Sequence, residues 1–344
     1  MTGPREALEG SDWLRRSPFL RGGAQGHKEW WHFAAYAPGL DVLVNFSLVD
    51  DSRPGAPAGQ EFARVTVLVR DEAWDGDVEL VPLERVEAPG GGLSMRFGAH
   101  RAAFVDGAYH LKVALARRPI SVDLVLRPEV LPSVAHNIPL DAGPPIHWLV
   151  VPRCRAEGSV TLRGVTHALT DAPAYHDHNW GHFAWGRDFA WEWGFGLPPG
   201  RENPWSMVFV RLSNRAHTLA RMQALFLWRG AWQHRVMRGD EVTITREGFL
   251  RPARVLKVPR AMALVSPSPA TDVPARLIVE ARGGGDRVRC VFTAHDLAQV
   301  VIPNDHDPGN TLINEVGGAV RVEGEVRGER VAMEGRAVFE FLGA

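Results

Sequence analysis

Apolar and polar side chains alternate with a period of two along most of this chain of 344 residues. The pattern is clear in segments 42–48, 61–69, 109–116, 120–126, 205–212, 276–281, 287–294 and 330–341. Because successive side chains of a strand point to opposite faces, this alternation predicts β-strands. Glycine triplets at 90–92 and 283–285 are typical of hairpin turns, and the helical candidates, which include residues 4–14, are weak. The sequence therefore predicts an all-β fold of antiparallel sheets with few helices.

The length of the chain suits two domains, each able to bury its own core. Several strands, such as 205–212, are apolar on both faces, which suits a barrel with an apolar interior. We expect an N-terminal extension over residues 1–20 and two lipocalin-like antiparallel β-barrels over 21–186 and 187–344, packed together. Because ligand sites favour domain junctions, a pocket between the two barrels is expected.

Charged side chains nearly cancel, with 39 basic against 40 acidic residues. This balance gives no electrostatic footprint for nucleic acid or for an anionic membrane surface. The N-terminal residues lack the apolar core of a signal peptide, and no later run predicts a transmembrane segment. Cys154 and Cys290 suit two free thiols in a reducing compartment better than one long-range disulfide. We therefore expect a soluble cytoplasmic protein, and the sequence leaves its oligomeric state open.

Residues 175–193 are the most unusual stretch of the chain, because they combine three histidines, three acidic residues and four tryptophans. A strand that only builds a core has no need of so many ionisable groups among indoles. Aromatic walls exclude water and shift the pKa of a neighbouring acid, as proton transfer to an apolar substrate requires. This segment is therefore predicted to carry a functional site.

Strand alternation predicts that Tyr175, Asp177 and Asn179 project to one face of this segment. Asp177 would act as a general acid if desolvation raises its pKa. Tyr175 would hold or relay the proton of that carboxyl group, and Asn179 would orient either partner. The alternative is a buried polar network that only pins the two barrels together.

The other face of the segment presents His176 and His178, a His-x-His pair with metal-ligand spacing. A third ligand would have to come from His27, His32 or His147, since the next glutamate along the chain is distant. We therefore predict no metal and expect these imidazoles to bond to backbone groups or to acids. The chain also lacks a nucleophile elbow, a phosphate-binding loop and a dinucleotide fingerprint, so no cofactor is predicted.

Further candidates are aromatic or lie beside aromatic residues. Glu29 is either a second buried carboxylate or part of a structural plug bridged to an arginine. Trp191 and Trp193 share a face as a pocket wall, while Glu192 points the other way and is either solvated or structural. Trp148 could stack on a substrate or belong to the core. The predicted substrate-binding set is Trp30, Trp31, Trp148, Trp180, Trp191, Trp193, Glu29, His176 and His178.

Three stretches of the sequence carry a family resemblance: residues 29–33, residues 175–181 and the C-terminal run 335–341. Together they resemble the AttH/CrtC group, which includes the carotenoid 1,2-hydratases (hydroxyneurosporene synthases). The resemblance implies two lipocalin-like barrels and cofactor-independent acid catalysis. In it, Asp177 would protonate a terminal alkene beside Tyr175, water would capture the tertiary carbocation, and Trp148 would steady that cation. Fungal decalin-forming cyclases of Diels–Alder type are similar in architecture, and the histidine-rich motif resembles the broader AttH branch.

These observations predict an enzyme, a hydratase (lyase) or cyclase (isomerase) of secondary metabolism. It would protonate an alkene of a hydrophobic isoprenoid or polyketide-like small molecule, leading to hydration or cyclisation in an apolar pocket. Two alternatives stay open beside it: a non-catalytic lipocalin-like carrier of a lipophilic ligand, and a pericyclic cyclase. A metal-dependent enzyme that uses His176 and His178 is a further alternative.

Overall fold

The fold was obtained as a computed structural model that describes residues 3–15, 26–50, 61–140, 145–252, 254–265, 272–305 and 307–343. The chain divides into two compact units. Unit 1 comprises Met1–Ile138 and Ala142–Ala184, and unit 2 comprises Pro139–Asp141 and Trp185–Ala344.

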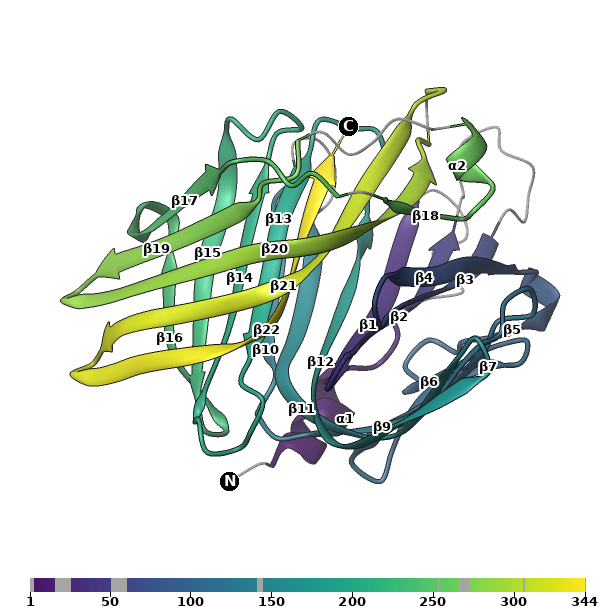
Figure 1. Ribbon diagram of the computed structural model, residues 1–344, viewed down its shortest axis with the longest axis horizontal. Coiled ribbons are helices and arrows are strands. Elements are labelled where there is room, and N and C mark those ends of the chain that lie inside the picture. The colour runs from purple at the N-terminus through teal and green to yellow at the C-terminus, as the bar shows by residue number, and fades with distance from the viewer. Residues whose placement is uncertain are drawn as a thin grey trace. The chain divides into compact units, whose positions relative to one another are not determined.

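Unit 1 is a single antiparallel sheet of twelve strands. The strands are β1 (His27–Ala37), β2 (Leu40–Asp50), β3 (Glu61–Arg70), β4 (Trp74–Val81), β5 (Val86–Glu87), β6 (Ser94–Phe97), β7 (His100–Val105), β8 (Ala108–Ala114), β9 (Ile120–Pro128), β10 (Ser133–Ile138), β11 (Ile146–Leu162) and β12 (Val165–His182). Their order is β4-β3-β2-β1-β12-β11-β9-β8-β7-β6-β5, with β10 paired to β11. Strand β12 therefore lies in the middle of the sheet, between β1 and β11 (Figure 1).

The connectivity of unit 1 rolls its sheet towards a barrel. The strands at the two ends of the order, β4 and β5, are consecutive in the chain and are joined through the short 3-10 helix η2 (Leu83–Arg85). So short a link brings the two ends of the sheet near each other. The inner face of the roll holds the aromatic core: the ring of Tyr109 on β8 lies 5.9 Å from that of Trp31 and 5.4 Å from that of Phe33, both on β1.

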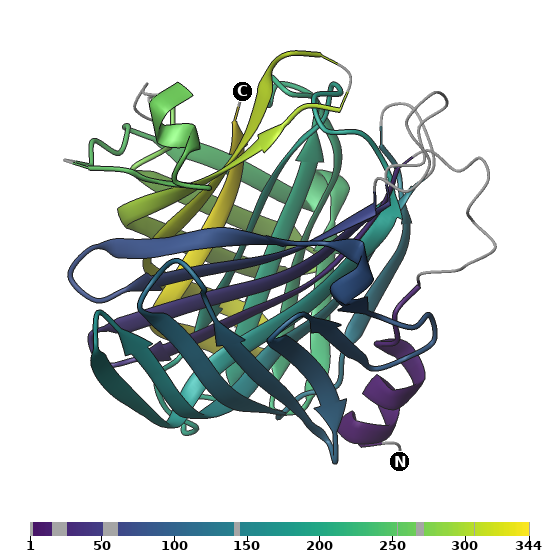
Figure 2. The same ribbon diagram turned by 90° about the vertical axis from the view of Figure 1, so that its right-hand side faces the viewer.

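The N-terminal helix α1 (Pro4–Ser11) lies at one end of the strands of unit 1 (Figure 2). Pro4 stands in the first turn, where proline is tolerated, and Glu6 places a negative charge near the positive end of the helix dipole. The helix buries Leu8 completely, and Asp12, the residue that caps its C-terminus, is also fully buried. The segment that the sequence marked as a weak helix candidate therefore contributes a carboxyl group to the interior of unit 1.

Unit 2 is a second sheet, of ten strands, antiparallel except at β18. The strands are β13 (Ala190–Leu197), β14 (Trp205–Ser213), β15 (Ala220–Arg229), β16 (Trp232–Arg238), β17 (Val242–Glu247), β18 (Leu256–Val258), β19 (Arg276–Gly283), β20 (Asp286–Pro303), β21 (Asn310–Val326) and β22 (Glu329–Gly343). Their order is β16-β15-β14-β13-β22-β21-β20-β19-β17, and β20, β21 and β22 run side by side as long ribbons (Figure 1). The end strands β16 and β17 are again joined by a short link, the 3-10 helix η3 (Gly239–Glu241), so this sheet is also rolled.

The core of unit 2 is apolar, with Phe292 lying 5.1 Å from Phe209 and 6.1 Å from Phe339 between ring centroids. In the described part of the chain the α-helices are α1 and the four-residue α2 (Met262–Val265). None of the described helices has the length and apolar character to cross a bilayer. The prediction of an all-β chain built from two antiparallel sheets with few helices is confirmed.

Candidate functional site

Strand β12 separates the predicted site into two faces. Residues directly opposite one another on neighbouring strands share a face, and Asp177 is opposite His32 of β1 and Val150 of β11. His178 is opposite Trp31, whose indole belongs to the core of unit 1. The inner face of the rolled sheet therefore carries the histidines of β12, and the outer face carries Asp177.

On the outer face the structure brings together the three predicted acid-face residues. The hydroxyl group of Tyr175 donates to Asp177 Oδ2 at 2.8 Å, and Asn179 Nδ2 donates to Asp177 Oδ1 at 2.9 Å. The side chain of Asp177 is nearly inaccessible, with 3% of the residue surface exposed, and Tyr175 is fully buried. Both carboxyl oxygens are thus held in fixed positions by protein donors.

Two of the predicted tryptophans flank this acid face. Trp30 on β1 and Trp148 on β11 are both directly opposite Asn179, one on each side of β12. Trp148 is buried, whereas Trp30 is partly exposed. Their indoles therefore share the outer face with Asp177, while the neighbouring Trp31 belongs to the inner face.

On the inner face, the carboxyl group of Asp12 from the end of α1 joins the two histidines. His176 Nε2 lies 3.0 Å from Asp12 Oδ2, and His178 Nδ1 lies 2.8 Å from Asp12 Oδ1. Tyr109 donates its hydroxyl hydrogen to Asp12 Oδ2 at 2.6 Å. The second nitrogen of His176, Nδ1, faces the backbone carbonyl oxygen of His32 at 3.0 Å. Asp12 therefore fixes the N-terminal helix to the central strand of the sheet.

Glu29 extends the same network. His178 Nε2 lies 2.8 Å from Glu29 Oε1, His27 Nε2 lies 3.1 Å from Glu29 Oε2, and the backbone N–H of Arg15 donates to Oε1 at 2.7 Å. The side chains of Asp12, Glu29 and His178 are all fully buried. Of the two sequence interpretations of Glu29, the buried carboxylate applies, and its side-chain partners are histidines. We name the set Asp12, Glu29, His176, His178 and Tyr109 the inner network.

The charges of the inner network stabilise one another. Burial alone would raise the pKa of Asp12, but the facing imidazoles of His176 and His178 outweigh it and hold that pKa well below its ordinary value. Burial likewise acts to raise the pKa of Glu29, yet hydrogen bonds from His178 and His27 bring it from 4.5 to about 2. Burial acts to lower the pKa of His178, but its bonds to Asp12 and Glu29 raise it from 6.5 to about 9. His178 is consequently an imidazolium flanked by two carboxylates at neutral pH.

His32 has the opposite electrostatic environment. Burial, reinforced by the charge of His176, lowers the pKa of His32 from 6.5 to about 3, so its imidazole is neutral. Its ring lies 6.4 Å from that of Tyr175, on the outer face. A neutral imidazole can both donate and accept a hydrogen bond.

The ring nitrogens of His176 and His178 all face protein oxygen atoms, so neither ring presents a free nitrogen to a metal ion. Within the described ranges, no group of three or more His, Cys, Asp or Glu side chains is arranged to hold one. These two histidines and Glu29, proposed from the sequence as substrate-binding residues, lie on the inner face and bond to protein groups.

Trp180, the remaining candidate on β12, lies on the inner face at its end. The imidazole of His147 stacks on its indole at 5.4 Å with an interplanar angle of 9°, and the guanidinium carbon of Arg15 lies 4.4 Å from the ring centroid. Stacking and cation–π contacts of this kind fix the indole in place.

In unit 2, Trp191 and Trp193 project to the same face of β13, as predicted from their spacing. Trp191 Nε1 donates to Glu340 Oε1, and Glu340 is directly opposite Trp193. Burial raises the pKa of Glu340. Glu192 points to the other face, where it is fully buried and accepts from Arg246 Nε at 2.6 Å, so it is not solvated.

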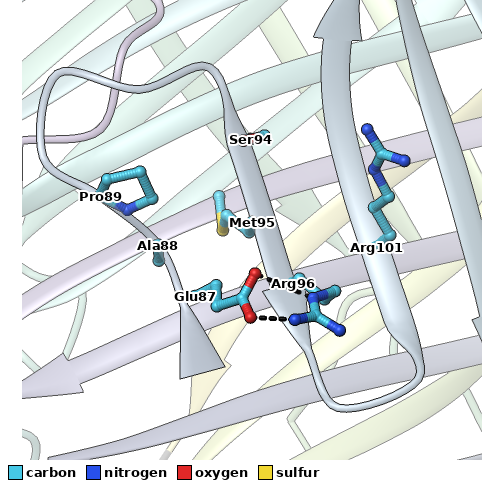
Figure 3. Close-up of a pocket in the computed structure, with 7 residues that line it drawn as sticks. All are labelled: Glu87, Ala88, Pro89, Ser94, Met95, Arg96 and Arg101. Carbon is cyan, nitrogen blue, oxygen red and sulfur yellow. Dashed lines mark hydrogen bonds and ion pairs between the residues drawn. The ribbon is translucent and has the colours of Figure 1, made fainter. Parts of the chain in front are cut away.

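A hollow of about 750 Å³ lies in unit 1, away from β12 in the order of the sheet (Figure 3). It is lined by Glu87, Ala88, Pro89, Ser94, Met95, Arg96 and Arg101. Glu87 and Arg96, directly opposite each other on β5 and β6, form an ion pair at the surface. None of the predicted site residues lines this hollow, and an exposed ion pair is weakly held.

No protein-family profile matches the sequence, and no curated protein is similar to it. Solved structures do match. An AttH protein from Nitrosomonas europaea aligns with a TM-score of 0.66 at 14% identity, over 92% of this chain and 92% of that chain. Kievitone hydratase from Nectria haematococca aligns with a TM-score of 0.56 at 12% identity, over 97% and 95% of the two chains. CghA crystallised with Sch210972 aligns with a TM-score of 0.59 at 14% identity, over 93% and 88%.

The chain shares the fold of these three proteins. The resemblance to the AttH/CrtC group, seen first in short sequence patches, is thereby confirmed at the level of the fold. The structural neighbours include a hydratase by name and a protein crystallised with Sch210972. At identities of 12–14%, the similarity shows that the fold is shared. The substrate and the mechanism have to be argued from the residues of this chain.

Sequence reasoning missed three residues around β12: Asp12, Tyr109 and, on the outer face, His32. Asp12 lies 164 residues from His176 in the chain, so no local spacing connects them. The one sequence feature that pointed to Asp12 was the helix candidate at residues 4–14, because the C-terminal end of an N-terminal helix can pack against a barrel. For His32, the sequence indicates only a possible metal ligand.

Proposed function

We propose that this protein catalyses an acid-dependent reaction of an alkene in an apolar small molecule, by hydration or cyclisation, with Asp177 as the proton donor. The observation that carries this proposal is the nearly inaccessible carboxyl group of Asp177, held by Tyr175 and Asn179 on the outer face of β12. Removal from water disfavours the charged form of a carboxyl group, so a buried carboxyl group can retain a proton and deliver it to an apolar substrate.

The two oxygens of Asp177 have different partners, and both partners can also bond to a protonated carboxyl group. Oδ1 accepts from the amide of Asn179, as the carbonyl oxygen of a carboxylic acid does. Oδ2 faces the hydroxyl group of Tyr175, which can accept as well as donate and so can receive the acidic hydrogen. After proton transfer, both partners donate to the carboxylate and stabilise it.

The reaction can be written without an added reagent other than water. Asp177 transfers its proton to one alkene carbon, which leaves a carbocation on the other carbon and a carboxylate on the protein. Water adds to the cation and its proton returns to Asp177, which gives a tertiary alcohol. In a cyclisation, a second double bond of the same molecule attacks the cation, and loss of a proton from carbon restores Asp177.

The tryptophans flanking Asn179 support this chemistry. Trp30 and Trp148 lie one strand away from Asp177 on either side, on the same face. The electron-rich face of an indole attracts a cation, and such contacts strengthen when water is excluded. The shared fold with kievitone hydratase, and with CghA crystallised with Sch210972, supports a small organic substrate.

Deuterium incorporation tests the proposal. The protein is incubated in D₂O with a panel of prenylated phenols and linear terpenoids, and products are analysed by mass spectrometry and NMR. Acid catalysis places one deuterium on carbon in the product. A pericyclic cyclase would place none there, and a carrier would return the ligand unchanged, so either of these results would refute the proposal.

Two substitutions test which residue transfers the proton to the alkene. Asp177→Asn keeps the shape of the side chain and removes the proton, so the rate of deuterium incorporation should fall roughly 10²–10⁴-fold. Tyr175→Phe should give a smaller loss, because the carboxyl group remains. Asp123→Asn, at an exposed carboxyl group of β9, is the matched control and should leave the rate unchanged. Equal rates in Asp177→Asn and the control would remove Asp177 from the mechanism.

A further inference from the structure

A row of polar side chains crosses the outer face of unit 1 and ends at Asp177. Thr66 of β3 is directly opposite Asn45 of β2, Asn45 is opposite His32 of β1, and His32 is opposite Asp177 of β12. Directly opposite residues share a face, so these four side chains stand side by side on neighbouring strands. With strands about 4.8 Å apart, the row spans roughly 14 Å. We name these four residues the polar row.

Hydrogen-bonding capacity remains open at the far end of the row. Asn45 Oδ1 accepts from the hydroxyl group of Ser47, the next residue on the same face. Within the described part of the chain, neither the amide nitrogen of Asn45 nor the hydroxyl group of Thr66 has a hydrogen-bond partner. Both residues are partly exposed, so a ligand can reach them.

A purely hydrocarbon ligand would fit such a surface poorly. Covering polar groups with hydrocarbon removes their water and returns no hydrogen bond, which weakens binding. A site built to bond an oxygen atom discriminates strongly against the analogue that lacks it. The imidazole of His32 stands between Asn45 and Asp177 in the row.

We propose that the polar row binds a hydroxyl or carbonyl group of the substrate, so that the natural substrate is an oxygen-bearing alkene and not a hydrocarbon polyene. This inference rests on the proposed function, because the position of the substrate's oxygen atom is given relative to Asp177. Asn45 lies two strands from Asp177, which places the oxygen atom roughly 5–10 Å from the alkene carbon that receives the proton. Asn45 and Thr66 are positioned to set specificity in this way, and the proton transfer itself stays with Asp177.

A pair of probes that differ by one hydroxyl group tests the inference. Para-prenylphenol and prenylbenzene carry the same alkene, and in the phenol the oxygen atom lies within the expected distance of it. Affinity of the full-length protein for each is measured by isothermal titration calorimetry. A preference for the phenol of about five- to tenfold for each hydrogen bond gained is expected. Equal affinity for the two probes would overturn the proposal.

Two substitutions test whether the preference for the phenol comes from the polar row. Asn45→Leu and Thr66→Val keep side-chain size and remove the polar group. Each should therefore weaken binding of the phenol, leave binding of prenylbenzene equal or stronger, and so reduce the ratio of the two affinities. Thr245→Val, at an exposed threonine of β17 in unit 2, is the matched control. A ratio unmoved by both substitutions in folded protein would also overturn the proposal. If either variant fails to fold, the comparison of probes in the unmodified protein still decides.

The outcome is separable from that of the proposed function. Binding ratios report the polar row whether or not turnover occurs, while deuterium incorporation reports Asp177. A phenol preference together with unchanged turnover in Asp177→Asn would retain the polar row as a binding subsite and refute the acid.

Discussion

The inner network leads to a strong prediction about Asp12, whose carboxyl group at the end of α1 is buried in unit 1. In Asp12→Asn, one carboxylate oxygen becomes an amide nitrogen that can only donate. Oδ2 of Asp12 faces Tyr109 and His176, and Oδ1 faces His178, so all three neighbours are placed to donate to it. If the amide oxygen serves Tyr109 and His176, the amide nitrogen faces His178 Nδ1, which must then lose its hydrogen.

The cost follows from the charge that His178 carries. Its pKa in the folded protein is about 9, against 6.5 for the unperturbed side chain. Since one pKa unit corresponds to 1.36 kcal/mol, holding His178 charged contributes roughly 3 kcal/mol to stability at neutral pH. Removing one partner of a buried ion pair costs a similar amount, about 3–5 kcal/mol. We therefore expect Asp12→Asn to lower the free energy of unfolding of unit 1 by about 3 kcal/mol.

Hydrogen–deuterium exchange of peptides from β12 measures this loss in unit 1 itself, and urea unfolding followed by tryptophan fluorescence gives the total. Glu9→Gln is the matched control, because Glu9 lies on the same helix in an exposed ion pair with Arg5. Its effect should be far smaller. A loss in Asp12→Asn no larger than that of the control would refute the assignment of a charged, mutually stabilised inner network.

The same substitution changes the dependence of stability on pH. Because the pKa of His178 is raised on folding, its contribution is complete below about pH 6.5 and is lost as the pH rises through about 9. Unit 1 of the unmodified protein should therefore lose stability between these values, and Asp12→Asn should show a flatter profile there. A profile as steep in the variant as in the unmodified protein would show that Asp12 does not hold the charge of His178.

Other residues give further predictions. Glu192→Gln should destabilise unit 2 by about 3 kcal/mol in urea unfolding, because it removes the charge of a fully buried carboxylate that pairs with both Arg246 and Arg211. Gly158→Ala should reduce the melting temperature strongly, since its φ is +130° and an added Cβ would lie 2.1 Å from a backbone oxygen of the neighbouring strand. Cys154 and Cys290 should resist alkylation by iodoacetamide at pH 8 until the protein is unfolded, because burial raises the pKa of both thiols.

Matched control variants accompany the first two of these predictions, and the unfolded protein is the reference for the third. Glu247→Gln removes an exposed carboxylate paired with Arg276 and should change stability far less than Glu192→Gln. Gly164→Ala has a positive φ but no atom near the added Cβ, so it should lower the melting temperature less than Gly158→Ala. Similar effects within either pair, or alkylation of the native protein as fast as that of the unfolded protein, would contradict the corresponding prediction.

The sequence alone was enough to predict the strands and to assign the side chains of residues 175–179 to the two faces of their strand. Alternation along a strand fixes which side chains share a face, so the spacing of Tyr175, Asp177 and Asn179 was sufficient to group them. The structure adds the hydrogen bonds that join them. The same local rule placed Trp191 and Trp193 together on β13.

What lies opposite a residue could not be predicted in this way. Glu192 was expected to be solvated or structural, and its partner Arg246 comes from β17, 54 residues further along the chain. The spacing of the chain carries no information about such a pair, because it forms only when two distant strands meet. Burial then decides whether a carboxylate is screened by water or must be neutralised by a partner.

The sequence alone was sufficient to predict that the chain forms strands, that Asp177 stands between Tyr175 and Asn179 on one face, and that two histidines stand on the other. The contacts between distant residues are visible only in the folded protein: Asp12 from α1 bonds both histidines, and Thr66, Asn45 and His32 continue the face of Asp177 across three more strands. This difference arises because backbone geometry sets the direction of side chains within one strand. The register between strands depends on the packing of the whole sheet.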